Sequence, residues 1–169
     1  GAYFHIVAHA LMKITLFMCA GAIIVTAHKD NISDMHGIGK KMPITMACFT
    51  IASLGIAGMP FIIGFLSKWN LALGALQVGQ PLFIAVLIGS ALLGLSYLMP
   101  VAYLAFFKPN AKGEFKSYGE ANKFMLIPIC VTAALSVILG IVPNFGPHLY
   151  DLASMAAQSI TQGWIGGGW

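Results

Sequence analysis

The chain contains no arginine, and only five of its 169 residues are acidic. Charged residues make up 8% of the sequence and hydrophobic residues 59%, whereas soluble domains use roughly 25% charged residues. This scarcity of charge excludes an ordinary soluble domain and indicates a membrane protein, with membrane lipid as its surroundings. The net charge of +4 comes from nine lysines spread along the chain, a pattern that excludes nucleic acid as a partner.

Cysteine is also scarce, and each of the three cysteines lies inside an apolar run, without CxxC or Cys/His spacing. The sequence therefore predicts neither a disulfide framework nor a metal site, and it suggests no cofactor. We expect Cys19, Cys48 and Cys130 to be small core residues. The chain begins with Gly1 directly inside an apolar stretch, without a charged leader, so we expect it to be the C-terminal portion of a longer protein.

The apolar runs predict an all-α fold, a polytopic transmembrane helix bundle with about five spans. We expect a membrane domain over residues 1–143, with spans at 3–27, 43–58, 60–76, 82–107 and 124–142. Residues 144–169 are predicted to form an interfacial tail, because apolar residues share one helical face and two tryptophans follow; a plain surface tail is the alternative. These tail residues are Leu149, Leu152, Ala156, Ile160, Trp164 and Trp169.

Residues 43–76 allow two interpretations. As a continuous helix they would be about 51 Å long, too long for one untilted crossing and barely enough for two. A single crossing would place the lysine-bearing loops 28–42 and 107–123 on one side of the membrane, in agreement with the positive-inside tendency. A turn at residues 58–60 would instead make two short crossings. The glycines and the proline favour two crossings, and that is our prediction.

Lys68 lies within the apolar run 58–76, where a charge costs about 2.5–3.5 kcal/mol on insertion scales. Gly58, Pro60 and Gly64 precede it and are predicted to interrupt the helix. Interrupted helices with polar groups near the membrane midplane are typical of ion sites in secondary transporters. We therefore expect Lys68 to lie beside a helix break and to face a wet cavity or a partner.

His5, His9 and Lys13 recur every four residues and form one polar stripe on a helix. A proton relay requires such a stripe, because each step must be short and each group must change charge near the working pH. His5 alone is explained slightly better by a hydrogen bond to a neighbouring helix than by a relay role. The complete stripe favours a relay role for His9 and Lys13.

None of the five acids lies inside an apolar span. A lysine at membrane depth without a counter-charge can act as a proton carrier; alternatively, its partner lies on a segment outside this sequence. Either case implies that the chain does not run a complete transport cycle alone. The acids are Asp30, Asp34, Glu114, Glu120 and Asp151.

Two runs of the sequence carry a specific resemblance. FHIVAHALMKITLFMCAG, residues 4–21, and GIGKKMPITMACFTIASLGIAGMPFIIGFLSKW, residues 37–69, closely resemble the proton-conducting membrane transporter family. This family comprises large subunits of Mrp-type cation/proton antiporters and the antiporter-like membrane subunits of respiratory complex I and of membrane hydrogenases. The resemblance covers about the first half of the chain strongly, and the remaining spans are compatible with it.

The resemblance implies the second inverted repeat of an antiporter-like fold, with residues 60–76 as its discontinuous helix. Lys13 and His9 match residues of the family's central proton path. His5 matches a position that is frequently polar in the family, and Lys68 matches the ionisable residue near the exit of the path. The implied function is translocation of H+, with Na+ as a further candidate ion. The chain would have no catalytic chemistry of its own, although it would be part of a proton-pumping NADH:quinone-type oxidoreductase or a related complex.

The implied partners are other membrane subunits of a multi-subunit antiporter or respiratory complex, in the cell inner membrane. The short tail favours an Mrp-type or hydrogenase-associated subunit over the longest complex I subunit. An alternative is a structural membrane module whose buried lysines pair with acids of a neighbouring subunit. Quinone binding is a weaker alternative, since only scattered aromatic residues are available for a quinone head group.

Overall fold

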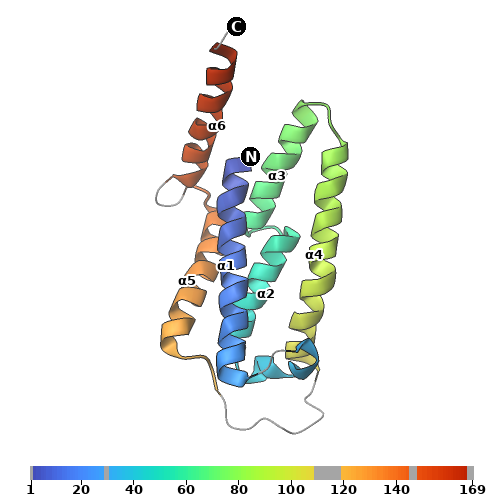
Figure 1. The fold of residues 1–169 in the computed structure, drawn as a ribbon, viewed down its shortest axis with the longest axis vertical. Helices are drawn as coiled ribbons and strands as arrows, with labels where there is room; N and C mark the ends of the chain where they lie inside the picture. Colours follow the sequence, from blue (N-terminus) through green and yellow to red (C-terminus); the bar gives the residue numbers. More distant parts are fainter. Residues whose placement is uncertain (1, 29–30, 109–118, 145–147, 167–169) are drawn as a thin grey trace.

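The computed structural model describes residues 2–28, 31–108, 119–144 and 148–166 (Figure 1). Within these ranges every regular element is a helix, so the prediction of an all-α bundle is confirmed. The α-helices are α1 (Ala2–Ala27), α2 (Pro43–Ala57), α3 (Ile63–Gln77), α4 (Leu82–Phe107), α5 (Lys123–Ile141) and α6 (Leu149–Gly166), with two short 3-10 helices, η1 (Ile32–Asp34) and η2 (Ile38–Lys40).

Three of the helices, α1, α4 and α5, are long and apolar enough to cross a membrane. At 1.5 Å per residue, a helix of 26 residues is about 39 Å long and exceeds a ~30 Å hydrocarbon core. Most of α4 is exposed on the surface of the chain, as expected for a helix whose apolar side chains contact lipid. The chain is therefore a polytopic membrane protein.

Helices α2 and α3 follow each other in the same direction (Figure 1). Along α1, His5 contacts Ser67 of α3, Met12 lies against Gly55 beside the break, and Cys19 contacts Thr45 at the start of α2. One helix therefore runs antiparallel to both segments. The prediction of two short crossings is wrong, and the single-crossing interpretation holds. The break interrupts the hydrogen bonding of the helix but does not reverse the chain.

The break begins at Gly58, which caps α2 with φ +90°. Its N–H bonds to the carbonyls of Leu54 and Gly55, and the N–H of Met59 also bonds to Leu54, a common helix C-terminus. Pro60 lies in the break, and α3 begins at Ile63. Gly64, in the first turn of α3, packs so closely on Gly55 that an added Cβ would overlap the Gly55 carbonyl. The missing side chain thus allows the two half-helices to meet.

Glu120, which precedes α5, closes the opposite end of α2. Its carboxylate accepts hydrogen bonds from the N–H of Ile44 at 3.0 Å and of Thr45 at 3.2 Å, and from the Thr45 hydroxyl at 2.6 Å. A carboxylate at a helix N-terminus bonds free N–H groups and complements the helix dipole. This contact fixes α2 to the segment that leads into α5.

Helix α6 lies beside the N-terminal end of α1 and extends past it (Figure 1). The Tyr150 ring packs edge-on against Phe4, with ring centroids 5.5 Å apart. The interfacial role of residues 144–169 stays a prediction. Several residues on which it depends have no described side chain or lie outside the described residues, namely Leu149, Ile160, Trp164 and Trp169.

Candidate functional site

The polar stripe predicted from the sequence runs along one face of α1. His5 and His9 are both half-buried, and their ring centroids are 5.7 Å apart. Lys13 follows one turn later, is exposed on the surface of this chain, and acts electrostatically on His9. The three groups extend about 12 Å along the helix axis. The stripe therefore begins at the exposed Lys13 and leads toward α3.

His5 joins the stripe to α3 through Ser67. Its Nδ1 lies 3.0 Å from the Ser67 hydroxyl oxygen, and the Ser67 side chain is completely buried. The hydroxyl donates its own hydrogen to the carbonyl of Gly64 at 2.9 Å, so it accepts from His5. In this arrangement the His5 Nδ1 carries the hydrogen, and Nε2 remains the proton-accepting nitrogen.

Lys68 lies next to Ser67 and reaches back across the break. Its ammonium donates a hydrogen bond to the carbonyl of Ile56 at 2.6 Å. In a continuous helix the N–H of residue 60 would bond this carbonyl, but Pro60 has no N–H. The half-buried ammonium takes that place at the negative end of the α2 dipole.

Gly58 makes room for the Lys68 side chain. A Cβ at Gly58 would lie 3.3 Å from Cδ of Lys68, and φ +90° is a conformation that other residues rarely adopt. His5 bonds to Ser67, the residue before Lys68, and the His9 ring lies beside that of His5. The structure thus places the two histidines along the part of α3 that carries Lys68, with Gly58 against the lysine stem and Lys13 at the far end of the stripe.

No carboxylate pairs with Lys13 or Lys68 among the residues that the structure describes, where the single ion pair joins His148 and Asp151. Lys68 instead has a backbone carbonyl as its partner. The described part of the chain also contains no group of three or more His, Cys, Asp or Glu side chains placed to hold a metal ion. The polar arrangement is suited to holding and transferring protons.

Several polar partners of the site were not predicted from the sequence. Ser67 directly precedes Lys68, so a buried hydroxyl beside a membrane lysine was a readable signal. Asn70 and Tyr150 are 80 residues apart, yet the Tyr150 hydroxyl donates to Oδ1 of Asn70 at 3.0 Å. Nothing in the local sequence of either residue indicates this contact.

Residues 1–94 match the family model described as NADH:quinone oxidoreductase/Mrp antiporter, TM, which is more than half of the 169 residues. The chain belongs to this family. The matched region includes all of α1, α2 and α3, and with them the histidines and lysines of the candidate site. Together with the apolar helices, the family identifies a multi-pass protein of the inner membrane.

Relatives of this family member include subunits of NADH-quinone oxidoreductase. The chain is 40% identical over 152 residues to NADH-quinone oxidoreductase subunit N of Desulforudis audaxviator (strain MP104C), covering 83% of this chain and 30% of the relative. It is 29% identical over 156 residues to NADH-quinone oxidoreductase subunit N of Bacillus anthracis, and the match covers 88% of this chain and 29% of the relative. It is 52% identical over 68 residues to NADH-ubiquinone oxidoreductase chain 5 of Aedes aegypti, and the match covers 40% of this chain and 12% of the relative.

The chain spans less than a third of the length of these relatives. These relatives are named as NADH-quinone or NADH-ubiquinone oxidoreductase subunits, and the preference for an Mrp-type or hydrogenase-associated subunit stays a prediction. The family model covers both the NADH dehydrogenase and the Mrp branch.

Proposed function

We propose that this chain conducts protons across the membrane as part of an antiporter-like subunit of a multi-subunit complex. The observation that carries this proposal is the contact of the α1 stripe with the break: His5 bonds to Ser67, and the neighbouring Lys68 bonds to the carbonyl that Pro60 leaves free. Intramembrane ionisable groups at an interrupted helix mark ion paths in transporters.

The relay runs from Lys13 through His9 and His5 to Lys68. His9 accepts a proton on one ring nitrogen and releases one from the other. His5 accepts and releases protons at Nε2, because its Nδ1 hydrogen remains bonded to Ser67, so a proton moves along α1 while the rings return to neutral. Water bridges the steps between the rings and the lysines, because a relay requires contacts of hydrogen-bond length. The buried Ser67 hydroxyl holds the His5 ring in one orientation.

Lys68 acts as the proton-holding group at the end of the relay. In its charged form the ammonium bonds to the Ile56 carbonyl, at the negative end of α2. Release of a proton weakens this charge-assisted hydrogen bond, because a neutral amine is a poorer donor. Proton occupancy of Lys68 is thereby coupled to the geometry of the break.

Other membrane subunits of a respiratory or antiporter complex are the proposed partners. The names of the NADH-quinone oxidoreductase relatives, which are subunits, support this. H+ is the proposed ion, with Na+ as a further candidate that the same complex would exchange for H+. Lipid surrounds the exposed apolar side chains of α4.

Replacing Lys13 by alanine in the full parent complex tests the relay. We expect proton translocation by membrane vesicles to be lost while the amount of assembled complex stays unchanged. Lys41→Ala is the matched control, because Lys41 is an exposed lysine outside the helices and the stripe. Translocation at the control level by Lys13→Ala would contradict the relay.

A second candidate function is a structural module in which Lys13 pairs with an acid of a neighbouring subunit. The exposure of Lys13 on this chain, without a carboxylate partner among the described residues, favours it. Under this alternative Lys13→Ala lowers the amount of assembled complex, and each complex that does assemble translocates protons normally. Native gels and flux per assembled complex separate the two functions.

A further inference from the structure

The face of α3 that contacts His5 continues one turn further to Asn70. Ser67 and Asn70 are three residues apart and so lie on the same side of the helix. Asn70 accepts the hydrogen bond from the Tyr150 hydroxyl, and its own amide donates to the carbonyl of Leu66 at 2.9 Å. The Tyr150 ring rests on Phe4, the residue before His5. The polar face of α3 therefore reaches the first turn of α6.

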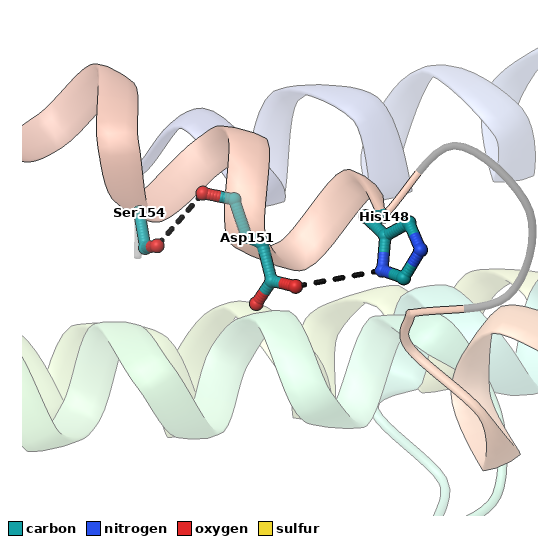
Figure 2. Close-up of polar contacts among 3 residues, drawn as sticks. All are labelled: His148, Asp151 and Ser154. Carbon is teal, nitrogen blue, oxygen red and sulfur yellow. Dashed lines mark hydrogen bonds and ion pairs between the residues drawn. The ribbon is translucent and has the colours of Figure 1, made fainter.

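Two titratable side chains flank Tyr150, namely His148 directly before α6 and Asp151 in its first turn. Nδ1 of His148 lies 3.5 Å from Oδ2 of Asp151, and the two side chains are 69% and 47% exposed (Figure 2). The Ser154 hydroxyl bonds to the backbone carbonyl of Asp151, so it does not occupy the Asp151 carboxylate (Figure 2). An exposed imidazole beside a carboxylate can accept a proton and exchange it with water.

A cavity of about 520 Å³ adjoins Asn70 between α3 and α4, at the end of the bundle where α3 turns into α4. Its lining is mainly apolar, with Asn70 and Gln80 as its polar side chains. The Asn70 amide thus separates this cavity from Tyr150. Because an amide does not change its protonation state in water, Asn70 serves to orient the Tyr150 hydroxyl.

We propose that the first turn of α6 is the proton outlet of the path, with Tyr150 as its inner hydroxyl and the His148–Asp151 pair as its surface acceptor. This inference rests on the proposed function. The Tyr150 hydroxyl first rotates about its C–O bond, so that its hydrogen leaves Asn70 and bonds to water beside His148. The hydroxyl then passes this hydrogen to that water in the same step in which its oxygen accepts a proton from water near Lys68, and a second rotation restores the bond to Asn70. The phenol stays neutral throughout, and His148 takes up the proton beside the Asp151 carboxylate before it passes the proton to the medium.

The test measures proton flux by the full complex in vesicles. Tyr150→Phe keeps the ring against Phe4 and removes only the hydroxyl, and His148→Gln changes an exposed side chain. We expect each change to lower flux by about tenfold at an unchanged amount of complex, within the range of positioned proton-transfer groups. Imidazole added on the side that carries the first turn of α6 should restore flux in His148→Gln. Ser154→Ala is the control and should keep normal flux.

Normal flux in both Tyr150→Phe and His148→Gln would overturn the outlet. The outlet would also be overturned if His148→Gln lowers flux and added imidazole does not restore it. That result would indicate that the His148–Asp151 pair only stabilises the start of α6. Lys68→Ala, measured in parallel, keeps the two proposals separate. If Lys68→Ala abolishes flux and the α6 variants do not lower it, the outlet fails and the proposed function stands. If Lys68→Ala pumps normally, the proposed function itself fails.

Discussion

The Lys68 ammonium lies 2.6 Å from the carbonyl oxygen of Ile56, twelve residues earlier and on the other side of a helix break. A lysine inside a membrane helix needs a polar partner, and an interrupted helix leaves carbonyls that need a donor. Pro60 removes the N–H that would otherwise bond this carbonyl. The lysine therefore supplies the donor that the broken helix lacks, and the carbonyl supplies the partner that the lysine needs. This pairing explains how the charge is accommodated with no carboxylate partner among the described residues.

Removing this pairing should reduce stability as well as transport. Lys68→Met deletes the donor and leaves the Ile56 carbonyl without it, which we expect to cost about 1–3 kcal/mol of unfolding free energy. Thermal unfolding of the purified full-length protein in detergent measures this cost. Lys41→Met is the control and should leave the unfolding temperature unchanged, whereas equal unfolding temperatures for both variants would show that the Lys68 contact does not stabilise the fold.

Gly58→Ala should strain the break. The left-handed conformation costs a residue with a Cβ roughly 1–2 kcal/mol, and the new Cβ would also approach Cδ of Lys68 at 3.3 Å. Gly74→Ala is a matched control on α3, because its Cβ would meet nothing within 4 Å. We expect lower stability and lower proton flux for Gly58→Ala only. A similar change in both variants would indicate a general effect of alanine.

Ser67→Ala should release the His5 ring while leaving the packing of α3 intact. Loss of a hydrogen bond of this kind costs about 0.5–1.5 kcal/mol, too little to prevent assembly. We expect reduced proton flux at normal complex levels, because the His5 ring loses its fixed orientation. Ser90→Ala serves for comparison, since the Ser90 hydroxyl is exposed and bonds only to the carbonyl of Leu87. Undiminished flux in Ser67→Ala would remove the serine from the mechanism.

Glu120→Ala should loosen the start of α2. The carboxylate caps the N–H groups of Ile44 and Thr45, and the loss of a helix cap costs about 0.5–2 kcal/mol. Glu120→Gln keeps an accepting oxygen but loses the charge, so its effect should lie between wild type and Glu120→Ala. Hydrogen exchange at the amides of Ile44 and Thr45 reports the change directly. Unaltered exchange in Glu120→Ala would show that the cap is not formed.

The helices could be predicted from the sequence, whereas the path of the chain at the break could not. Long apolar runs fix where helices form, and Gly58 with Pro60 indicated where one ends. The direction of the chain after the break depends on contacts of α1 and α4, which local sequence does not contain. Glycines and a proline in a short run favour a reversal of the chain, although in this protein they only release hydrogen bonds within one crossing.

Long-range polar contacts could also not be predicted from the sequence. His5 bonds to Ser67, Thr45 to Glu120 and Tyr150 to Asn70, pairs that are 62, 75 and 80 residues apart. Periodicity placed His5, His9 and Lys13 on one face of a helix but gave no information about which helix that face meets. The partner of Lys68 was sought among carboxylates, and a backbone carbonyl that a proline leaves free has no signature of its own.

The most direct measurement is the proton flux of the parent complex carrying Lys68→Ala, normalised to the amount of assembled complex and compared with Lys41→Ala. Our account predicts that Lys68→Ala assembles and loses proton translocation while Lys41→Ala keeps it. Equal flux per assembled complex in the two variants would contradict the claim that the lysine at the helix break carries protons.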